Sequence, residues 1–440
     1  MRGRLNLFQT AMLRWRELHP YSAIHVVRID RPLDPSRVAA VIERVLVAAG
    51  LTGLVLDVKR RAFEYKGGPA SPVLAVHEGE ASAMDVVASV LERELNEPFT
   101  PDGPVNPFRF FVVDGGASFY LGLAYDHVVA GGESIVGLMK GLVDAYLDQG
   151  GREKTHNPTM PAPRPLDRYP PTYPRLLLRH FGMFFSGMRR LPDMAASSRR
   201  SVRPRYPGGL DPHNAFAQFR LETVEFAAII RTAKAWGVTV NDLLLAALLR
   251  ALAPIVGERA ATARRREIGV ASIINIRRDL GIAPDTTFGQ FLSTFHVSHP
   301  MPPGATLRDV SRDVQIVTSR IKRERLYLQS LLAIAAASAI WRFLSKERRH
   351  RFDAKNYPVW GAITMLDVDA LWSERGARMR PPEYLRAVST GAPTPLVIAV
   401  TTAGGVLHAG ISYRTAAYTR AQIDSIAAAM IADARSLICK

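Results

Sequence analysis

The stretch AYDHVVAGGESI, residues 124–135, decides the fold. Two apolar segments rich in aromatic residues precede it, NPFRFFVV (106–113) and ASFYLGLAY (117–125). They are joined at Asp114-Gly115-Gly116, and glycine supplies the positive φ that a tight hairpin turn needs. We therefore expect a β-hairpin that leads directly into this stretch.

His127 stands where the pattern of apolar residues changes. From Ile135 onward the apolar residues recur at helical spacing as far as Gly150, which predicts an amphipathic helix. His127 is therefore expected at the exit of a strand, followed by the flexible pair Gly131-Gly132. A titratable side chain beside backbone that another molecule can approach closely is a common place for a general base. A hydrogen-bonded core histidine is the alternative interpretation of the same residue.

A family resemblance begins at Asn96 and extends through this stretch. The run NEPFTPDGPVNPFRFFVVDGGASFYLGLAYDHVVAGGESIVGLMKGL resembles the segment that carries the HHxxxDG motif in the chloramphenicol acetyltransferase-like superfamily. That superfamily includes CoA-dependent acyltransferases, nonribosomal peptide condensation domains and wax ester synthases. The resemblance implies an α/β fold with two similar subdomains, each a mixed sheet with flanking helices, and an active tunnel between them.

The resemblance also implies roles for the motif residues. Asp126 occupies the position of the first His, His127 that of the second, Gly131 that of the Asp and Gly132 that of the Gly. The second His is the family's catalytic base, and it is kept here. The family's Asp holds the loop by an ion pair, and Glu133 is our candidate for that task. On an extended strand Asp126 points away from His127, so we expect it to make a structural hydrogen bond or ion pair.

The second half carries a weaker version of the family pattern. GVTVNDLLLAAL (237–248) resembles a helix start found in condensation domains and wax ester synthases. The pairing of REIGVASIINIRRDL with TTFGQFLSTFHVSH resembles the family's NxRxxL segment followed by a Gly-Asn element, with Gln290 in place of the Asn. Because the matching strand lines the interface in the family, Ser293 and Thr294 are candidate oxyanion donors, and ordinary strand residues are the alternative. Asn275 and Arg277 are expected to brace the channel or to meet donor phosphates.

Apolar periodicity, caps and turn residues predict the remaining elements. Strands are expected at 22–30, 53–58, 61–66, 72–77, 214–222 and 266–280, and helices at 5–18, 34–49, 85–95, on both sides of Gly237, 305–324, 326–350 and 420–437. Residues 357–372 are expected to form a strand and a loop, and 395–413 a hairpin through Gly404-Gly405.

Length and composition predict a globular protein. With 440 residues and 48% hydrophobic content, the chain is long enough for two domains. Its single cysteine, Cys439, excludes an intramolecular disulfide framework and fits a reducing compartment, and no Cys/His cluster has metal-ligand spacing. The first 20 residues predict a helix and not a signal peptide. The segment 331–341 is too short for a membrane span, which needs roughly 18 apolar residues, and is expected to be a buried core helix.

Positive charge is concentrated between the two halves. The net charge is +17, and residues 164–207 contain ten arginines against two aspartates, or 10 − 2 = +8. This charge favours an anionic partner: the pyrophosphate of CoA, an acidic carrier protein or a lipid surface, with nucleic acid the weakest option because no binding module is recognisable. We divide the chain into an N-terminal subdomain at 1–150, a Pro/Arg-rich linker at 151–207 and a C-terminal subdomain at 208–440. The basic, aromatic segment 175–191 either lies at a membrane interface or packs across the halves.

The function implied by the resemblance is acyl transfer. His127 would deprotonate a hydroxyl or amine acceptor, which then attacks a thioester on CoA or on the phosphopantetheine of an acyl carrier protein. CoA or carrier thioesters would be co-substrates, with no tightly bound cofactor and no metal. A condensation-type synthase with both substrates on carriers, and a binding protein without catalysis, are the alternatives. No GxSxG elbow is present, so a serine hydrolase ranks low. The expected location is cytoplasmic, with peripheral membrane contact through 175–191.

Overall fold

The computed structural model describes residues 2–70, 73–78, 82–100, 103–148, 199–207, 209, 211–257, 265–282, 287–341, 343–373, 380–391 and 394–438. The predictions for the segment 175–191, for most of the linker and for Cys439 lie outside these residues. The division of the chain at residues 150 and 207 stays a prediction.

The first half alternates helices and strands. Its elements are β1 (Arg2–Arg4), α1 (Leu7–Arg16), β2 (Ser22–Ile29), α2 (Pro35–Ala48), β3 (Leu54–Asp57), β4 (Ala62–Tyr65), β5 (Leu74–His77), α3 (Ala83–Asn96), β6 (Gly103–Val105), β7 (Phe108–Asp114), β8 (Phe119–Asp126) and α4 (Gly132–Leu147). The predicted hairpin is confirmed, because β7 and β8 pair antiparallel from Phe108↔Tyr125 to Asp114↔Phe119. Asp34 caps α2 by accepting the Arg37 N–H at 3.0 Å, with proline in the first turn, as its sequence predicts.

The second half begins at a strand and ends at a capped helix. Its elements are β9 (Asn214–Leu221), α7 (Thr223–Trp236), α8 (Val240–Gly257), β10 (Ile268–Asn275), β11 (Leu292–His299), α9 (Leu307–Arg323), α10 (Tyr327–Trp341), α11 (Lys346–Asn356), β12 (Gly361–Asp367), α12 (Val368–Ser373), β13 (Tyr384–Val388), β14 (Leu396–Ala403), β15 (Val406–Arg414) and α13 (Arg420–Arg435). Gly237 ends α7 at a φ of 70°, a left-handed conformation that glycine adopts without strain.

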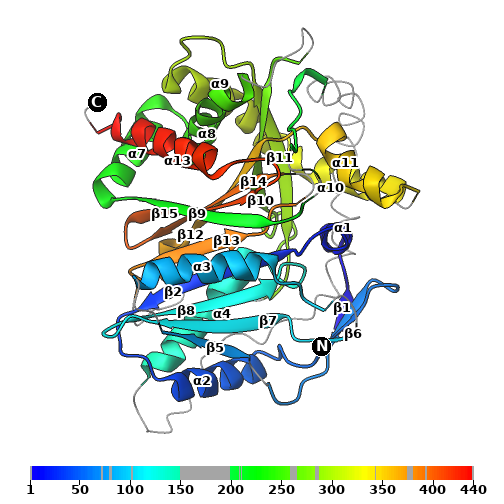
Figure 1. Ribbon diagram of the computed structural model, residues 1–440, viewed down its shortest axis with the longest axis vertical. Helices are drawn as coiled ribbons and strands as arrows, with labels where there is room; N and C mark the ends of the chain where they lie inside the picture. Colours follow the sequence, from blue (N-terminus) through cyan, green and yellow to red (C-terminus); the bar gives the residue numbers. More distant parts are fainter. Residues whose placement is uncertain are drawn as a thin grey trace.

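Within the described residues, the strands form three sheets. A five-stranded sheet has the order β13-β2-β8-β7-β5, a six-stranded sheet the order β11-β10-β12-β14-β15-β9, and β1-β4-β3-β6 form a small third sheet. Both large sheets are mixed, since β5 runs parallel to β7 and β12 runs parallel to β10 and β14. Figure 1 shows α3 between the two large sheets, where it contacts β2 and β9. The predicted α/β fold with two subdomains is confirmed.

Strand β13 crosses from the second half into the first sheet. Tyr384–Val388 pairs antiparallel with β2, and Arg386 lies opposite His25. The sequence analysis missed this strand because five residues with a central arginine, close behind two prolines, carry no clear alternation. The halves are therefore joined by backbone hydrogen bonds as well as by packed side chains.

Three other expectations need correction. The single helix expected at 326–350 is two helices, α10 and α11, and the loop expected after β12 is the short helix α12. Helix α10 is not fully buried: Leu331 is buried, but Ile340 is 50% exposed. Among the described helices, α8 alone is long and apolar enough to cross a membrane by length and composition, yet 67% of it is buried inside the protein. It packs against α9, α13 and β10, which is the environment of a core helix.

Candidate active site

The loop after β8 is held by its own residues and by α1. Asp126 ends the strand, and its Oδ1 accepts the Val128 N–H at 3.1 Å. Gln9 of α1 donates its side-chain amide to the Val128 carbonyl at 2.8 Å. Gln9 also takes part with Asn6 in the capping box that starts α1. One cap thus fixes both the first helix and the loop that carries His127.

His127 is 7% exposed and is oriented by its Nδ1 atom. Nδ1 lies 3.1 Å from the Ala130 carbonyl oxygen, which only accepts, and 3.5 Å from Gln290 Nε2, which donates to the His127 carbonyl at 3.0 Å. We therefore assign the proton of the neutral ring to Nδ1. The ring stacks on Tyr21, with centroids 5.7 Å apart, and meets the edge of Tyr125 at 5.8 Å. Nε2 has no hydrogen-bond partner among the described residues and carries the free lone pair.

Burial keeps His127 neutral. Desolvation lowers its pKa from 6.5 to about 4; the hydrogen bond to the Ala130 carbonyl opposes this shift, and the charge of Arg386 adds to it. The pKa of the neighbouring His25 is lowered well below its ordinary value by burial and by the same arginine. Around neutral pH, His127 therefore presents an unprotonated Nε2, the form that a general base requires.

Asp126 turns away from His127 and pairs with Arg16 of α1. Its side chain is fully buried, and the carboxylate contacts the Arg16 guanidinium directly. Burial raises the pKa of this carboxyl, and Arg16 with the Val128 N–H opposes the rise. The residue at the family's first His position is therefore part of a brace between β8 and α1.

Gly131, at the family's Asp position, faces the side chain of Gln290. A Cβ atom added at Gly131 would lie 2.7 Å from Gln290 Oε1, closer than non-bonded atoms approach. Gln290 is fully buried, and its Nε2 donates to the His127 carbonyl at 3.0 Å. Two departures from the family pattern thus meet in space: the longer side chain at 290 fills the volume that the missing side chain at 131 leaves.

Arg277 anchors the start of α4. Its guanidinium donates to Ser134 Oγ at 2.5 Å and to the Thr287 carbonyl at 2.7 Å, and its Nε lies 3.7 Å from Glu133 Oε2. Ser134 Oγ also accepts the Gly289 N–H at 3.1 Å. The loop between β10 and β11 is thereby tied to the His127 loop, with Glu133 as the carboxylate beside Arg277.

The structure separates the other residues predicted for the site. Asn275 and Thr294 line a cavity between the two halves, and Asn275 Oδ1 accepts the Arg277 N–H at 2.9 Å. Ser293 does not: its hydroxyl donates to the Tyr327 carbonyl at 2.5 Å and lies 2.8 Å from Ser330 Oγ, both on α10. Because successive residues of a strand point to opposite faces, only one of this pair can face the cavity. The Ser293 hydroxyl is therefore turned toward α10, and the structure gives no support to Ser293 as an oxyanion donor.

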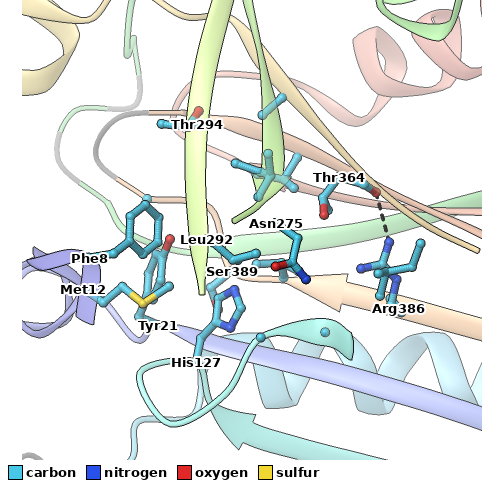
Figure 2. A pocket seen from close by; sticks show the side chains of 18 of the residues that line it. Phe8, Met12, Tyr21, His127, Asn275, Leu292, Thr294, Thr364, Arg386 and Ser389 are labelled. Atoms are coloured by element: carbon cyan, nitrogen blue, oxygen red, sulfur yellow. Dashed lines mark hydrogen bonds between the residues drawn. The ribbon is translucent and has the colours of Figure 1, made fainter. Parts of the chain in front are cut away.

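A cavity of about 160 Å³ lies between the halves. The motif loop with Gly131 and Gly132, the strands β10 and β11, α1, and the crossover strand β13 contribute to its lining. Figure 2 shows Phe8, Met12 and Tyr21 on one side of His127, and Asn275, Thr364 and Arg386 on the other. The cavity thus has an aromatic, apolar side and a polar side, with His127 between them.

Sequence reasoning missed several polar residues of this cavity, among them His25, Thr364 and Arg386. Nδ1 of His25, on β2, forms a hydrogen bond of 2.7 Å with the Tyr384 hydroxyl. Arg386 is 3% exposed, and burial lowers its pKa to about 10. A histidine and an arginine in otherwise apolar strands were the signal that could have found two of them. In the part of the chain that the structure describes, no group of three or more His, Cys, Asp or Glu side chains could hold a metal ion.

Comparisons with known proteins identify the fold of this chain. No protein-family model and no curated protein matches the sequence. Among solved structures, the EpoB nonribosomal peptide synthetase cyclization-docking bidomain from Sorangium cellulosum matches with a TM-score of 0.69 at 13% identity, covering 100% of this chain and 85% of that one. The first condensation domain of the CDA synthetase matches with a TM-score of 0.63 at 15% identity, covering 100% and 97%. SgcC5 from Streptomyces globisporus matches with 0.67 at 13%, covering 99% of both chains.

The chain has the condensation-domain fold. The epimerization domain of tyrocidine synthetase B shares it, with a TM-score of 0.66 at 14% identity over 100% of this chain. The solved structures with this fold are thus named for three different reactions, condensation, cyclization and epimerization. The fold by itself therefore does not determine which reaction a protein catalyses.

Proposed function

We propose that the protein transfers an acyl group from a thioester to a hydroxyl or amine acceptor, with His127 as the general base. The observation that carries the proposal is the state of His127: its Nδ1–H is held by the Ala130 carbonyl, and its unprotonated Nε2 is free beside a cavity between the two halves. An acyltransferase needs such a base, and it needs water excluded from the thioester.

The step balances with this single base. Nε2 accepts the acceptor's O–H or N–H proton as that oxygen or nitrogen bonds to the thioester carbonyl carbon. The C–S bond then breaks, and the thiolate leaves as a thiol by taking the proton from His127. No covalent enzyme intermediate is needed, and Thr294 is a candidate donor to the developing oxyanion because it lines the same cavity.

The donor is CoA or a carrier protein. The net charge of +17 suits the phosphates of CoA and an acidic carrier equally. The fold likeness to condensation domains favours the second candidate function, a synthase that takes both substrates from carriers. Saturable binding of a loaded carrier, together with no turnover of free acyl-CoA, would distinguish it.

The test is acceptor-dependent release of free thiol. The purified protein is incubated with a panel of acyl-CoAs and loaded carriers and with pooled alcohols and amines, and thiol is measured with a chromogenic disulfide. We expect release only when an acceptor is present, and a loss of roughly 10²–10⁴-fold in His127→Ala, the range for removing a general base.

The matched control is His213→Ala. His213 is an exposed histidine outside the cavity, so its removal should leave turnover unchanged. Circular dichroism of both variants separates lost chemistry from lost structure. Equal turnover by wild type and His127→Ala would refute the role of His127, and silence of every donor with every acceptor would shift the weight to the alternative of a non-catalytic binding protein.

A further inference from the structure

Arg386 is a buried cation at the polar side of the cavity. It lies on the crossover strand β13 and is 3% exposed. Its Nε donates to Thr401 Oγ1 at 2.8 Å, and its Nη2 donates to the carbonyl oxygens of Thr364 at 3.0 Å and Val400 at 2.6 Å. All three partners are neutral, so they orient the guanidinium and leave its charge uncompensated.

The cavity lining does not neutralise this charge. Among the described residues no carboxylate forms an ion pair with Arg386, and Glu133, the acidic residue of the lining, has its carboxylate beside Arg277. His25 and His127 share the lining, and both are held neutral by burial. The cavity therefore carries about one net positive charge in a place where a cation without a counter-ion is costly.

One amino group of Arg386 is open toward the motif loop. No described residue hydrogen-bonds to Nη1, and a Cβ atom built on Gly132 would lie 3.5 Å from it. Gly132 is the first residue of α4, and the positive end of a helix dipole adds to the field at this point. The same Cβ atom would lie 2.6 Å from Leu366 Cδ1, so a glycine is needed for the backbone at the start of α4 to come this close to Leu366 and the guanidinium.

A purely structural task does not require the charge. An arginine that only braces β13 against β12 and β14 gains three hydrogen bonds to neutral groups, and it keeps a desolvated cation whose Nη1 is unused. The two N–H bonds of Nη1 are open and carry part of the guanidinium charge, so they can donate charge-assisted hydrogen bonds to an anionic oxygen such as that of a carboxylate.

We propose that one of the two substrates carries a free carboxylate that binds Arg386 Nη1, while its apolar part lies toward Phe8 and Tyr21. This inference rests on the proposed acyl transfer and deepens it by naming the substrate class. The carboxylate belongs either to the acceptor, as in a hydroxy or amino acid, or to the acyl group, as in the half-thioester of a dicarboxylic acid. An acceptor held on a carrier by a thioester has lost this carboxylate.

Paired substrates test the inference through turnover. The acceptor pairs are 3-phenyllactate with its methyl ester and phenylalanine with phenylalaninamide, and the donor pair is adipyl-CoA with hexanoyl-CoA. Wild type should prefer the charged member of an acceptor pair or of the donor pair by roughly tenfold to a hundredfold, the range of a charge-assisted hydrogen bond. Which pair shows the preference identifies the substrate that carries the carboxylate.

Binding gives a second readout that does not depend on turnover. Isothermal titration calorimetry compares 3-phenylpropionate with 3-phenylpropionamide, and hexanoate with hexanamide, on wild type, Arg386→Lys and Arg386→Gln. Wild type should bind one carboxylate at least tenfold more tightly than its amide, and Arg386→Lys should keep part of this preference. Arg386→Gln, which keeps a donor toward Thr401, should lose it.

The control and the contrary outcomes are separate from those of the proposed function. Arg414→Gln removes another buried arginine, one that lies outside the cavity, and should keep the preference. Thiol release without any preference would leave acyl transfer intact and overturn the carboxylate. If Arg386→Gln loses carboxylate binding but wild type releases no thiol, the carboxylate site is supported and the proposed acyl transfer is not. A preference that survives in a folded Arg386→Gln would also overturn the inference.

Discussion

The neutral state of His127 makes the stability of the protein depend on pH. The pKa of its ring is about 4 in the folded protein against 6.5 in the unfolded chain. Between these two values the unfolded chain binds the extra proton, so stability falls as the pH falls from 6.5 toward 4. The full difference of 6.5 − 4 = 2.5 units corresponds to about 3 kcal/mol, and about 2 kcal/mol of it is lost between pH 7 and pH 5.

Urea unfolding of wild type and His127→Asn at pH 7 and pH 5 measures this term. Asparagine keeps a donor for the Ala130 carbonyl and does not titrate, so the variant should lose about 2 kcal/mol less than wild type between the two pH values. Titrating groups that do not interact with His127 cancel in the double difference, whereas His25 does not cancel fully because the charge of a protonated His127 lowers the pKa of His25. His213→Asn, at an exposed position, should follow wild type. Equal losses in wild type and His127→Asn would refute the buried, neutral histidine on which the proposed base depends.

Three further predictions concern the residues around the loop. Gly131→Asp restores the family's carboxylate but collides with Gln290, so it should cost about 1–3 kcal/mol of stability, and Gly131→Asp with Gln290→Asn should recover most of it in the same urea assay. Arg16→Met leaves the buried carboxylate of Asp126 without its ion-pair partner and should lower the free energy of unfolding by about 3–5 kcal/mol at pH 7. The double variant with Asp126→Asn should recover much of this loss, and an equal loss in the double variant would contradict the ion pair. Ser293→Ala removes a hydrogen bond to α10 outside the cavity and should lower stability by about 1 kcal/mol with thiol release unchanged; a fall in turnover would restore it as an oxyanion candidate.

Local signals predicted much of the fold. Hairpins with glycine turns, such as β7–β8 and β14–β15, and capped helices, such as α2 and α13, depend on neighbouring residues and were found from the sequence. Strand β13 was not, because it is stabilised by pairing with β2, more than 350 residues earlier. The break between α10 and α11 was missed for a different reason: helical residues continue on both sides of it, so periodicity carries no boundary.

The residues of the candidate site could likewise be predicted where local sequence determines them, and not where distant pairing does. His127 and its glycines could be placed because one short segment contains them, and Thr294 and Asn275 because a resemblance pointed to their strands. Ser293 was a candidate beside Thr294 because the sequence does not determine which face of β11 meets the cavity, and the structure turns its hydroxyl toward α10. His25 and Arg386 stand out as polar residues in apolar strands, but their place beside His127 could not be predicted, since it arises only when β2 pairs with β8 and β13 pairs with β2.

The altered motif is compatible with catalysis because each departure has a partner in space. Asp126, in place of the first His, pairs with Arg16, and Gln290 occupies the volume that Gly131 vacates. Arg277 remains anchored to the loop through Ser134, with Glu133 nearby. His127 is held by Nδ1 on the Ala130 carbonyl and lines the cavity, which is the arrangement that a general base requires. These contacts support the reading of His127 as a working base, one whose loop is positioned by other residues than those of the common motif.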